Sequence, residues 1–435
     1  MTAPDVTTAS DLEKRTMRKV TWRLMPFLMA CYLMAFIDRT NIGMASLQMN
    51  EDIGLTPAVF GFGASLFFIS YFIFEVPSNL MLQKFGARMW IARIMVTWGL
   101  VSAGMAFVWN QHSFFVMRFL LGAAEAGFFP GVILYLTYWL PPAYRGRMLA
   151  LFAVAIPVSS FIGSPLSGAL LKLDGLGGLY GWQWLFILEG LPTVLLGIAC
   201  LKVLTDKPAQ ASWLDDEEKA WLQGQISQAS ALAKVSHASP WALFRSAPFW
   251  ALVIACCGAS AAGSTLGVWQ PMLLKTFGLT DLQTGLINAI PYGVAATAMV
   301  LWGRHSDKTG ERAWHTAIPL LLIAVGALGT FIVGGLLPTV ILLTFVLIGA
   351  YCFKGPFWSM ASGWLSTGTA AAGIAGINAT SNLIGGGLMV NVYGQINDRT
   401  GSHLLALIPL ACLTVLSALA ILWVARVGAR SAPAT

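Results

Sequence analysis

Two clusters of ionisable residues lie inside strongly apolar segments of the sequence. The first is Arg118 with Glu125, seven residues further on, and the second is Asp38 with Arg39. Residues seven apart in an α-helix lie two turns apart on nearly the same face. An ionisable group at membrane depth costs about 2.5–3.5 kcal/mol on insertion scales. Such groups are therefore expected to line a cavity, to pair with each other, or to act on an ion or substrate.

These clusters allow two interpretations. In the structural one, Arg118 and Glu125 form an ion pair that locks two helices together. In the functional one, the arginine binds an anion and the carboxyl carries a proton along a transport pathway. The presence of Asp38 and Arg39 in a separate apolar segment favours the functional interpretation.

The composition predicts that the chain spans a bilayer. Of its 435 residues, 57% are hydrophobic and only 10% are charged, whereas soluble proteins carry about 25% charged residues. The apolar segments supply twelve candidate spans of about 20 residues or more. The expected spans are 24–47, 57–82, 90–109, 114–139, 148–171, 183–204, 249–274, 283–302, 315–336, 338–357, 364–392 and 404–427.

The distribution of positive residues predicts the orientation. Of the 26 Lys and Arg residues, 20 fall in the termini and loops of one side, three fall on the other side and three lie within spans. Positive residues mark the cytoplasmic side, so both termini are expected in the cytoplasm. The net charge of +7 is explained by this bias and does not indicate nucleic-acid binding.

The expected architecture is an all-α membrane protein of two six-helix halves. Similar loops after the second and eighth spans, near Lys84 and Gly303, indicate an internal repeat of the kind that transporters use. The expected divisions are a cytoplasmic segment 1–23, a bundle 24–204, a cytoplasmic linker 205–247, a bundle 248–427 and a cytoplasmic tail 428–435.

Several motifs, in order along the chain, resemble a known family. The loop 303–312, with Gly303, Asp307, Lys308, Gly310 and Arg312, resembles the signature loop of the major facilitator superfamily. The segments 36–43, 75–79, 118–130 and 181–189 together resemble its anion:cation symporter family. The resemblance covers 20–427. The matching loop of the first half, Gly86-Ala-Arg88, departs from the pattern because it lacks the usual acidic residue.

This resemblance implies a fold of two six-helix halves that alternate access to a central site. It also implies import of small organic anions together with protons, for example tartrate, sugar acids or aromatic acids. Arg39 and Arg118 would bind the substrate carboxylate, since guanidinium offers a planar fork for it. Asp38 and Glu125 would carry the protons. Substrate that occupies an arginine would release the neighbouring acid to take up a proton.

Further residues are candidates for substrate contacts or for gates. Lys354 either extends its amine to the cytoplasmic interface or binds a second substrate carboxylate. Asn378 and Asn382 share a helix face, where they hydrogen-bond either substrate hydroxyls or neighbouring helices. The remaining candidates for substrate binding are Asn41, Trp269 and Gln270. The candidates for gating are Glu75, Arg88, Gly303, Asp307, Lys308 and Arg312.

Other classes of function are disfavoured. The sequence has no His-Glu-x-x-His or Gly-x-Ser-x-Gly motif, and its five histidines are scattered. The six cysteines have no metal-ligand spacing, so neither an enzyme nor a metal or cofactor site is expected. The preferred function is a monomeric, proton-driven symporter for an organic carboxylate in a bacterial inner membrane. The alternative is a proton-driven exporter of an organic anion or drug.

Overall fold

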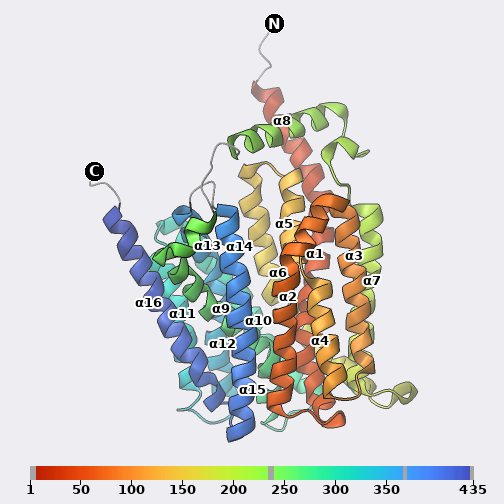
Figure 1. The fold of residues 1–435 in the computed structure, drawn as a ribbon, viewed down its shortest axis with the longest axis vertical. Coiled ribbons are helices and arrows are strands. Elements are labelled where there is room, and N and C mark those ends of the chain that lie inside the picture. Colours follow the sequence, from red (N-terminus) through yellow and green to blue (C-terminus); the bar gives the residue numbers. More distant parts are fainter. Residues whose placement is uncertain (1–5, 234–239, 366–369, 432–435) are drawn as a thin grey trace.

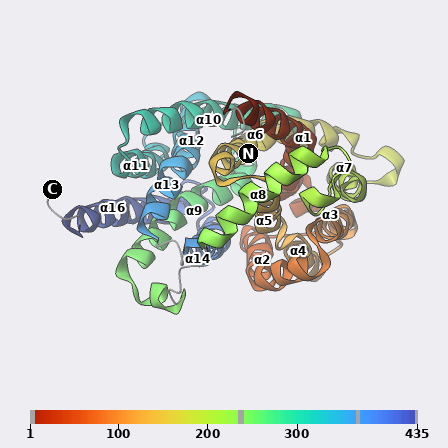
Figure 2. The same cartoon turned by 90° about the horizontal axis from the view of Figure 1, so that it is seen from above.

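The computed structural model describes residues 6–233, 240–365 and 370–431. In these residues, all regular secondary structure is helical. The long helices stand side by side and together form a single bundle (Figure 1). Seen from above, they divide into two groups, α1 to α7 and α9 to α16, with α8 lying across one end (Figure 2).

The first group precedes the linker and forms the N-terminal half. Its helices are α1 (Val6–Asp52), α2 (Pro57–Phe85), α3 (Ala87–Gly104), α4 (Gln111–Glu125), α5 (Phe128–Trp139), α6 (Pro142–Leu170) and α7 (Gly181–Val203). The linker contains α8 (Asp216–Ala233).

The second group forms the C-terminal half. Its helices are α9 (Ala247–Lys275), α10 (Asp281–Thr309), α11 (Ala313–Gly329), α12 (Leu336–Cys352), α13 (Lys354–Trp364), α14 (Ala370–Ser381), α15 (Met389–Thr400) and α16 (Ile408–Ser431). A π-helical segment, Asn382–Leu388, joins α14 to α15.

Ten stretches of the described chain are long and apolar enough to cross a bilayer. Helix α11 is apolar but has only 17 residues. The span expected at 364–392 is displaced, because α13 continues to Trp364 and α14 to α15 run on to Thr400, and residues 366–369 lie outside the described residues. The count of twelve spans, the cytoplasmic termini and the domain limits stay predictions.

One of the expected spans that carry site residues is broken, and another is continuous. The span expected at 114–139 ends as α4 at Glu125 and restarts as α5, because Gly127 adopts the left-handed conformation with φ of 87°. Glycine alone adopts this conformation without strain. In the second half, the span expected at 338–357 runs on as one stretch, Leu336–Trp364, because Phe353 between α12 and α13 keeps helical backbone angles, and Lys354 lies within this stretch.

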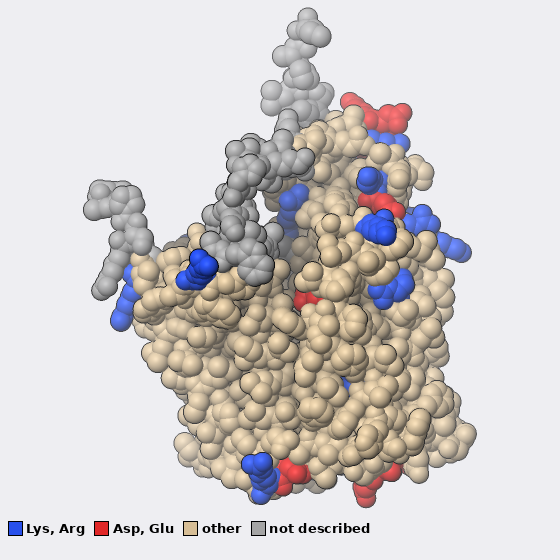
Figure 3. Space-filling model, viewed as in Figure 1, with Lys and Arg blue, Asp and Glu red and all other residues tan. Residues whose placement is uncertain are grey.

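Charged side chains gather at the two ends of the molecule. In the space-filling view, Lys, Arg, Asp and Glu cluster at the top and bottom, and the broad middle band is almost free of them (Figure 3). Many large hydrophobic side chains are exposed along the helices, among them Leu195 on α7 and Leu301 on α10. This pattern is typical of a belt that faces lipid.

The linker helix α8 is tied to the start of α1. Glu218 of α8 is fully buried and accepts from Arg15 at 3.0 Å and from Lys19 at 2.9 Å. Glu218 therefore anchors α8 to α1. Asp215 accepts from Arg15 at 3.1 Å. The backbone N–H of Glu218, helped by Arg15 and Lys19, lowers the pKa of Asp215.

The two halves are in close contact at the end opposite α8. A Cβ atom at Gly285 would lie 2.3 Å from the carbonyl oxygen of Ser164, so α6 and α10 touch backbone to backbone. The α2–α15 contact is similar, since a Cβ at Gly394 would lie 2.5 Å from the carbonyl oxygen of Pro57. Gln48 of α1 also donates to Asp281 of α10 at 2.8 Å. This end of the bundle is therefore closed.

Candidate functional site

Arg39 and Glu125 form an ion pair in the middle of the N-terminal half. Nε of Arg39 lies 2.5 Å from Oε1 of Glu125. The side chain of Arg39 is 23% exposed, whereas that of Glu125 is 1% exposed. An entering anion can therefore reach the arginine, while the carboxylate is shielded behind it.

Arg118 does not form an ion pair with Glu125, which counts against the structural interpretation of this cluster. Glu125 lies at the last residue of α4 and pairs with α1 instead. Arg118 is 3% exposed and its only hydrogen bond among the described residues goes to the carbonyl oxygen of Ala64, at 3.4 Å. Its Nε is buried without a partner. Arg118 thus holds unused hydrogen-bonding capacity next to the pair.

Aromatic rings hold both guanidinium groups in place. The ring of Phe67 lies 5.1 Å from the Arg118 guanidinium carbon and 5.6 Å from that of Arg39. Tyr71 lies 5.1 Å from that of Arg39. A cation over an aromatic face gains about 0.5–2 kcal/mol. These rings orient the cations without neutralising them, and Arg118, which makes no ion pair with a described residue, keeps its charge available to an anion.

Lys354 supplies a third cation from the opposite half. Its amine lies 5.1 Å from the ring of Tyr351, and it makes no ion pair with any described residue. Lys354 lies close enough to Arg39 for the two positive charges to repel each other, and Tyr351 lies close enough to Tyr32 of α1 for an electrostatic interaction. Cations from α1 and α13 thus face a common space between the halves.

The tyrosines around this space were not predicted as site residues. Tyr32 precedes Arg39 by two helical turns and Tyr351 precedes Lys354 by one turn. A tyrosine at helical spacing from a cation within a span is the sequence signal that would have found them. Both are buried, and their hydroxyls offer hydrogen bonds to a polar ligand.

Asp38 points away from its neighbour Arg39. Its carboxyl is 1% exposed and accepts from Ser102 of α3 at 3.1 Å and from Thr193 of α7 at 2.9 Å. Asn41, one turn further along α1, is buried on the same side, beside Glu189. Neither residue joins the Arg39–Glu125 pair, so the predicted site is divided over two faces of α1.

The structure places the other predicted substrate contacts in packed surroundings. Trp269 is fully buried, donates to the Val390 carbonyl at 3.1 Å and stacks on Tyr393. Gln270 is also fully buried. Both belong to the closed end. Asn382 accepts from Ser260 at 3.2 Å, which is an interhelical contact, and Asn378 is half-buried on α14. Their roles as substrate contacts stay predictions.

The predicted gating residues form two separate groups. In the second-half loop, Arg312 pairs with Asp307 at 2.8 Å, and Gly303 and Lys308 lie on the same stretch of α10. In the same loop, partial burial raises the pKa of Glu311, but hydrogen bonds from the backbone N–H of Trp314 and from His315 outweigh it, so the pKa is lowered. Glu75 is buried on α2 and, among the described residues, makes no ion pair.

The first-half loop obtains its missing acid from a distant residue. Oδ1 of Asp206, which follows α7, accepts from the backbone N–H of Arg88 at 2.8 Å. It therefore sits at the N-terminus of α3, where a negative charge is favourable. The sequence reading missed Asp206 because it lies 118 residues further along the chain.

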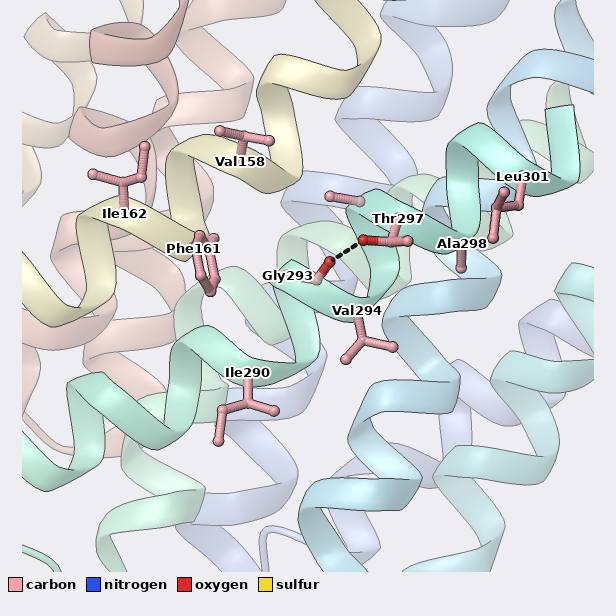
Figure 4. Close-up of a pocket in the computed structure, with 10 residues that line it drawn as sticks. Val158, Phe161, Ile162, Ile290, Gly293, Val294, Thr297, Ala298 and Leu301 are labelled. Atoms are coloured by element: carbon pink, nitrogen blue, oxygen red, sulfur yellow. Dashed lines mark hydrogen bonds between the residues drawn. The ribbon is translucent and has the colours of Figure 1, made fainter. Parts of the chain in front are cut away.

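A separate hollow of about 910 Å³ opens at the side of the molecule, between α6 and α10. Phe161 and Ile162 of α6 face Ile290 and Val294 of α10 across it (Figure 4). Its lining is almost wholly apolar, with Thr297 as its polar residue. It offers no charge to a carboxylate and is distinct from the site around Arg39.

Among the described residues, no group of His, Cys, Asp and Glu could hold a metal ion.

Residues 28–390 match the sequence model of the Major Facilitator Superfamily. The chain belongs to this superfamily. Its members are transporters and not enzymes, so the protein is a multi-pass membrane transporter. The fold agrees with the match. A solved structure of a bacterial homologue of the human lysosomal transporter Spinster, inward-facing and occupied, superposes with a TM-score of 0.77 at 17% identity, covering 94% of this chain and 98% of that one.

Two relatives in sequence differ in their names. A protein of Agrobacterium vitis named "Putative tartrate transporter" is 50% identical over 96% of both chains. A protein of Acinetobacter baumannii named "Quinolone resistance transporter" is 39% identical over 90% of this chain and 91% of its own. These likenesses extend over nearly the whole transporter.

Proposed function

We propose that this transporter imports a small organic carboxylate together with protons across a bacterial inner membrane. The observation that carries the proposal is the Arg39–Glu125 pair, in which an accessible cation is matched to a shielded acid. The name of the Agrobacterium vitis relative supports a tartrate-like anion. The carboxylate would bind Arg39, with Arg118 and its unused Nε as the second guanidinium.

Substrate binding and proton uptake are linked through competition for Arg39. When a substrate carboxylate takes the guanidinium, Glu125 loses its counter-charge. A buried carboxylate without a partner is costly, so Glu125 takes up a proton. In the reverse step, departure of the substrate lets Arg39 pair with Glu125 again, and the proton is released.

Protons also offset the membrane potential. Moving one negative charge inward against the potential costs about 2.3 kcal/mol per 100 mV. One proton per negative charge cancels this cost. With Lys354 opposite Arg39, the site would present cations to both ends of a diacid, and two protons would make import of that diacid electroneutral.

The two halves would alternate access to this site. With the cytoplasmic termini that the charge bias predicts, the closed end at Gly285 and Gly394 faces the periplasm. Opening requires these backbone contacts to separate while the halves close at the other end, the rocking motion expected for a fold built from repeats.

The test is uptake into proteoliposomes with an imposed proton gradient. The panel contains tartrate, a sugar acid, 4-hydroxyphenylacetate and phthalate, with Arg39→Gln as the inactive control. Accumulation of one acid that collapses with a protonophore is the expected result. Accumulation that ignores the protonophore would contradict proton coupling.

Proton-driven export is the second candidate, favoured by the name of the Acinetobacter baumannii relative. The same vesicles distinguish it. An exporter expels preloaded anion or quinolone when protons flow the opposite way, and a symporter moves both in one direction.

A further inference from the structure

A second acidic residue lies buried beside Asp38, on the face of α1 that is turned away from Arg39. Glu189 of α7 is 1% exposed. It precedes Thr193, the donor to Asp38, by one helical turn. The two carboxyls therefore lie at neighbouring levels of the same α1–α7 contact.

The polar surroundings of Glu189 are incomplete. Oε1 accepts from Ser167 of α6 at 2.7 Å, but Oε2 is buried without a hydrogen-bond partner. The Asn41 amide lies beside this carboxyl and is the donor that faces it, but Nδ2 does not reach Oε2 in full hydrogen-bonding geometry. Buried polar atoms are normally hydrogen-bonded, so a small shift between Asn41 and Glu189 would join this donor to this acceptor.

No cation neutralises the two carboxyls within the described part of the chain. Arg39, next to Asp38, pairs with Glu125, and neither Asp38 nor Glu189 makes an ion pair. Ser102, Ser167, Thr193 and Asn41 are the neutral groups that face them. Glu125 is the further acid that acts on Asp38, across α1. Other titratable groups on the elements packed here lie more than one turn away along their helices or in exposed loops, among them Cys31, Tyr32, Asp52, Arg88, Arg93, Arg145, Lys172, Asp174, Cys200 and Lys202.

A pair of charged carboxylates in this position would be costly on two counts. Each would lack a counter-ion at membrane depth, and the two would repel each other. Binding a proton removes the charge at either group. The neighbouring hydroxyls tolerate both states, because a hydroxyl both donates and accepts.

We propose that Glu189 is a further proton-binding residue of the transport cycle, which shares the α1–α7 contact with Asp38. This inference rests on the proposed proton coupling. A proton adds to a carboxylate oxygen of the pair from one side of the membrane and leaves to the other side, and no other bond changes.

Helix α1 links this pair to the substrate. Arg39 follows Asp38 directly, so a shift of α1 when substrate displaces Glu125 also moves Asp38 relative to Ser102 and Thr193. Close packing limits any independent movement of α7, because a Cβ at Gly190 would lie 2.7 Å from the backbone nitrogen of Ala103 on α3. The movement of α1 thus falls on the contact between its own Asn41 and Glu189 of α7.

The test compares Glu189→Gln with Glu189→Asp in proteoliposomes. The readouts are the number of protons moved per substrate, from the gradient that just stops net flux, and substrate exchange at equal pH. We expect Glu189→Gln to retain exchange while the proton-to-substrate ratio falls by one, and Glu189→Asp to keep the ratio. An unchanged ratio in Glu189→Gln overturns the inference alone. A wild-type protein with no proton-driven flux overturns the proposed function and this inference together.

A second variant covers the case in which Glu189→Gln does not exchange substrate. Ser167→Ala keeps the carboxyl and removes its hydrogen bond. The pH profile of uptake is then expected to shift while exchange at saturating substrate is retained. A profile identical to that of the wild type would overturn the inference.

Discussion

Arg39 of α1 donates a 2.5 Å hydrogen bond to Glu125 at the last residue of α4. The pair joins two helices that are 86 residues apart in the sequence, directly before the left-handed break at Gly127. The break ends α4 at this point, and the acid is therefore placed at a helix end and not within a continuous span.

This relationship predicts the behaviour of Glu125→Gln. The amide still accepts from Arg39 but takes up no proton. Substrate exchange should therefore persist, while accumulation driven by a proton gradient falls to the level of passive equilibration. The measurement is gradient-driven uptake beside counterflow in the same vesicles. Concentrative uptake equal to that of the wild type would show that Glu125 does not carry the proton.

Lys354 should distinguish diacids from monoacids. A hydrogen bond to a charged group contributes about 1.5–3 kcal/mol, so Lys354→Ala should weaken diacid binding about 10- to 150-fold and leave monoacid binding nearly unchanged. Equilibrium binding to the detergent-purified protein measures both. An equal loss for both acids would assign Lys354 a general electrostatic or packing role.

The glycine contacts at the closed end should control the conformational equilibrium. In Gly285→Ala, the added methyl group would meet the Ser164 carbonyl at 2.3 Å, so the closed arrangement of this end is disfavoured. Labelling of single cysteines placed on the buried surfaces of α6 or α10 should become several-fold faster. Gly363→Ala on α13 is the matched control, since its methyl group meets nothing within 4 Å. Equal labelling of the two variants would contradict the prediction.

His403, in the turn before α16, should make the fold sensitive to acid. Burial lowers its pKa to about 4, and its Nδ1 lies 3.0 Å from the Tyr393 hydroxyl. An unfolded histidine has a pKa of about 6.5. Between these values the unfolded state binds more protons, so the stability of the fold decreases as the pH falls from about 6.5 to 4, by about 3 kcal/mol.

The variant His403→Gln should remove part of this loss. Thermal unfolding of the purified protein at pH 7 and at pH 4.5 gives the comparison, with His112→Gln, at an exposed position, as the control. A decrease in unfolding temperature as large in His403→Gln as in the wild type would assign the acid sensitivity to other groups.

The sequence predicted the site in part because charge inside an apolar segment is conspicuous. Arg39, Arg118, Glu125 and Lys354 stand out in this way. Helical spacing suggested Arg118 as the partner of Glu125, but the actual partner comes from α1. Spacing reports only which residues of one helix share a face, and the rotation of one helix against another is set by packing.

The same limit explains the residues that were missed. Asp38 and Arg39 are adjacent, yet about 100° apart around the helix, so they serve different neighbours. Glu189 appeared only as part of a motif, because nothing in a single span indicates that it faces Asp38. The fold class followed from hydrophobicity and the charge bias, whereas the break at Gly127 depends on tertiary packing.

The attachment of α8 to α1 has a practical consequence. Because Glu218 forms ion pairs with Arg15 and Lys19 of α1, α8 is expected to move together with the N-terminal half. A fluorophore or an antibody fragment fixed to the exposed side of α8 would follow that half alone. With a second fluorophore on α16, the distance between the two labels would change when the halves rock. Fluorescence would then report that movement, and the labelled protein would serve as a sensor for its own ligand.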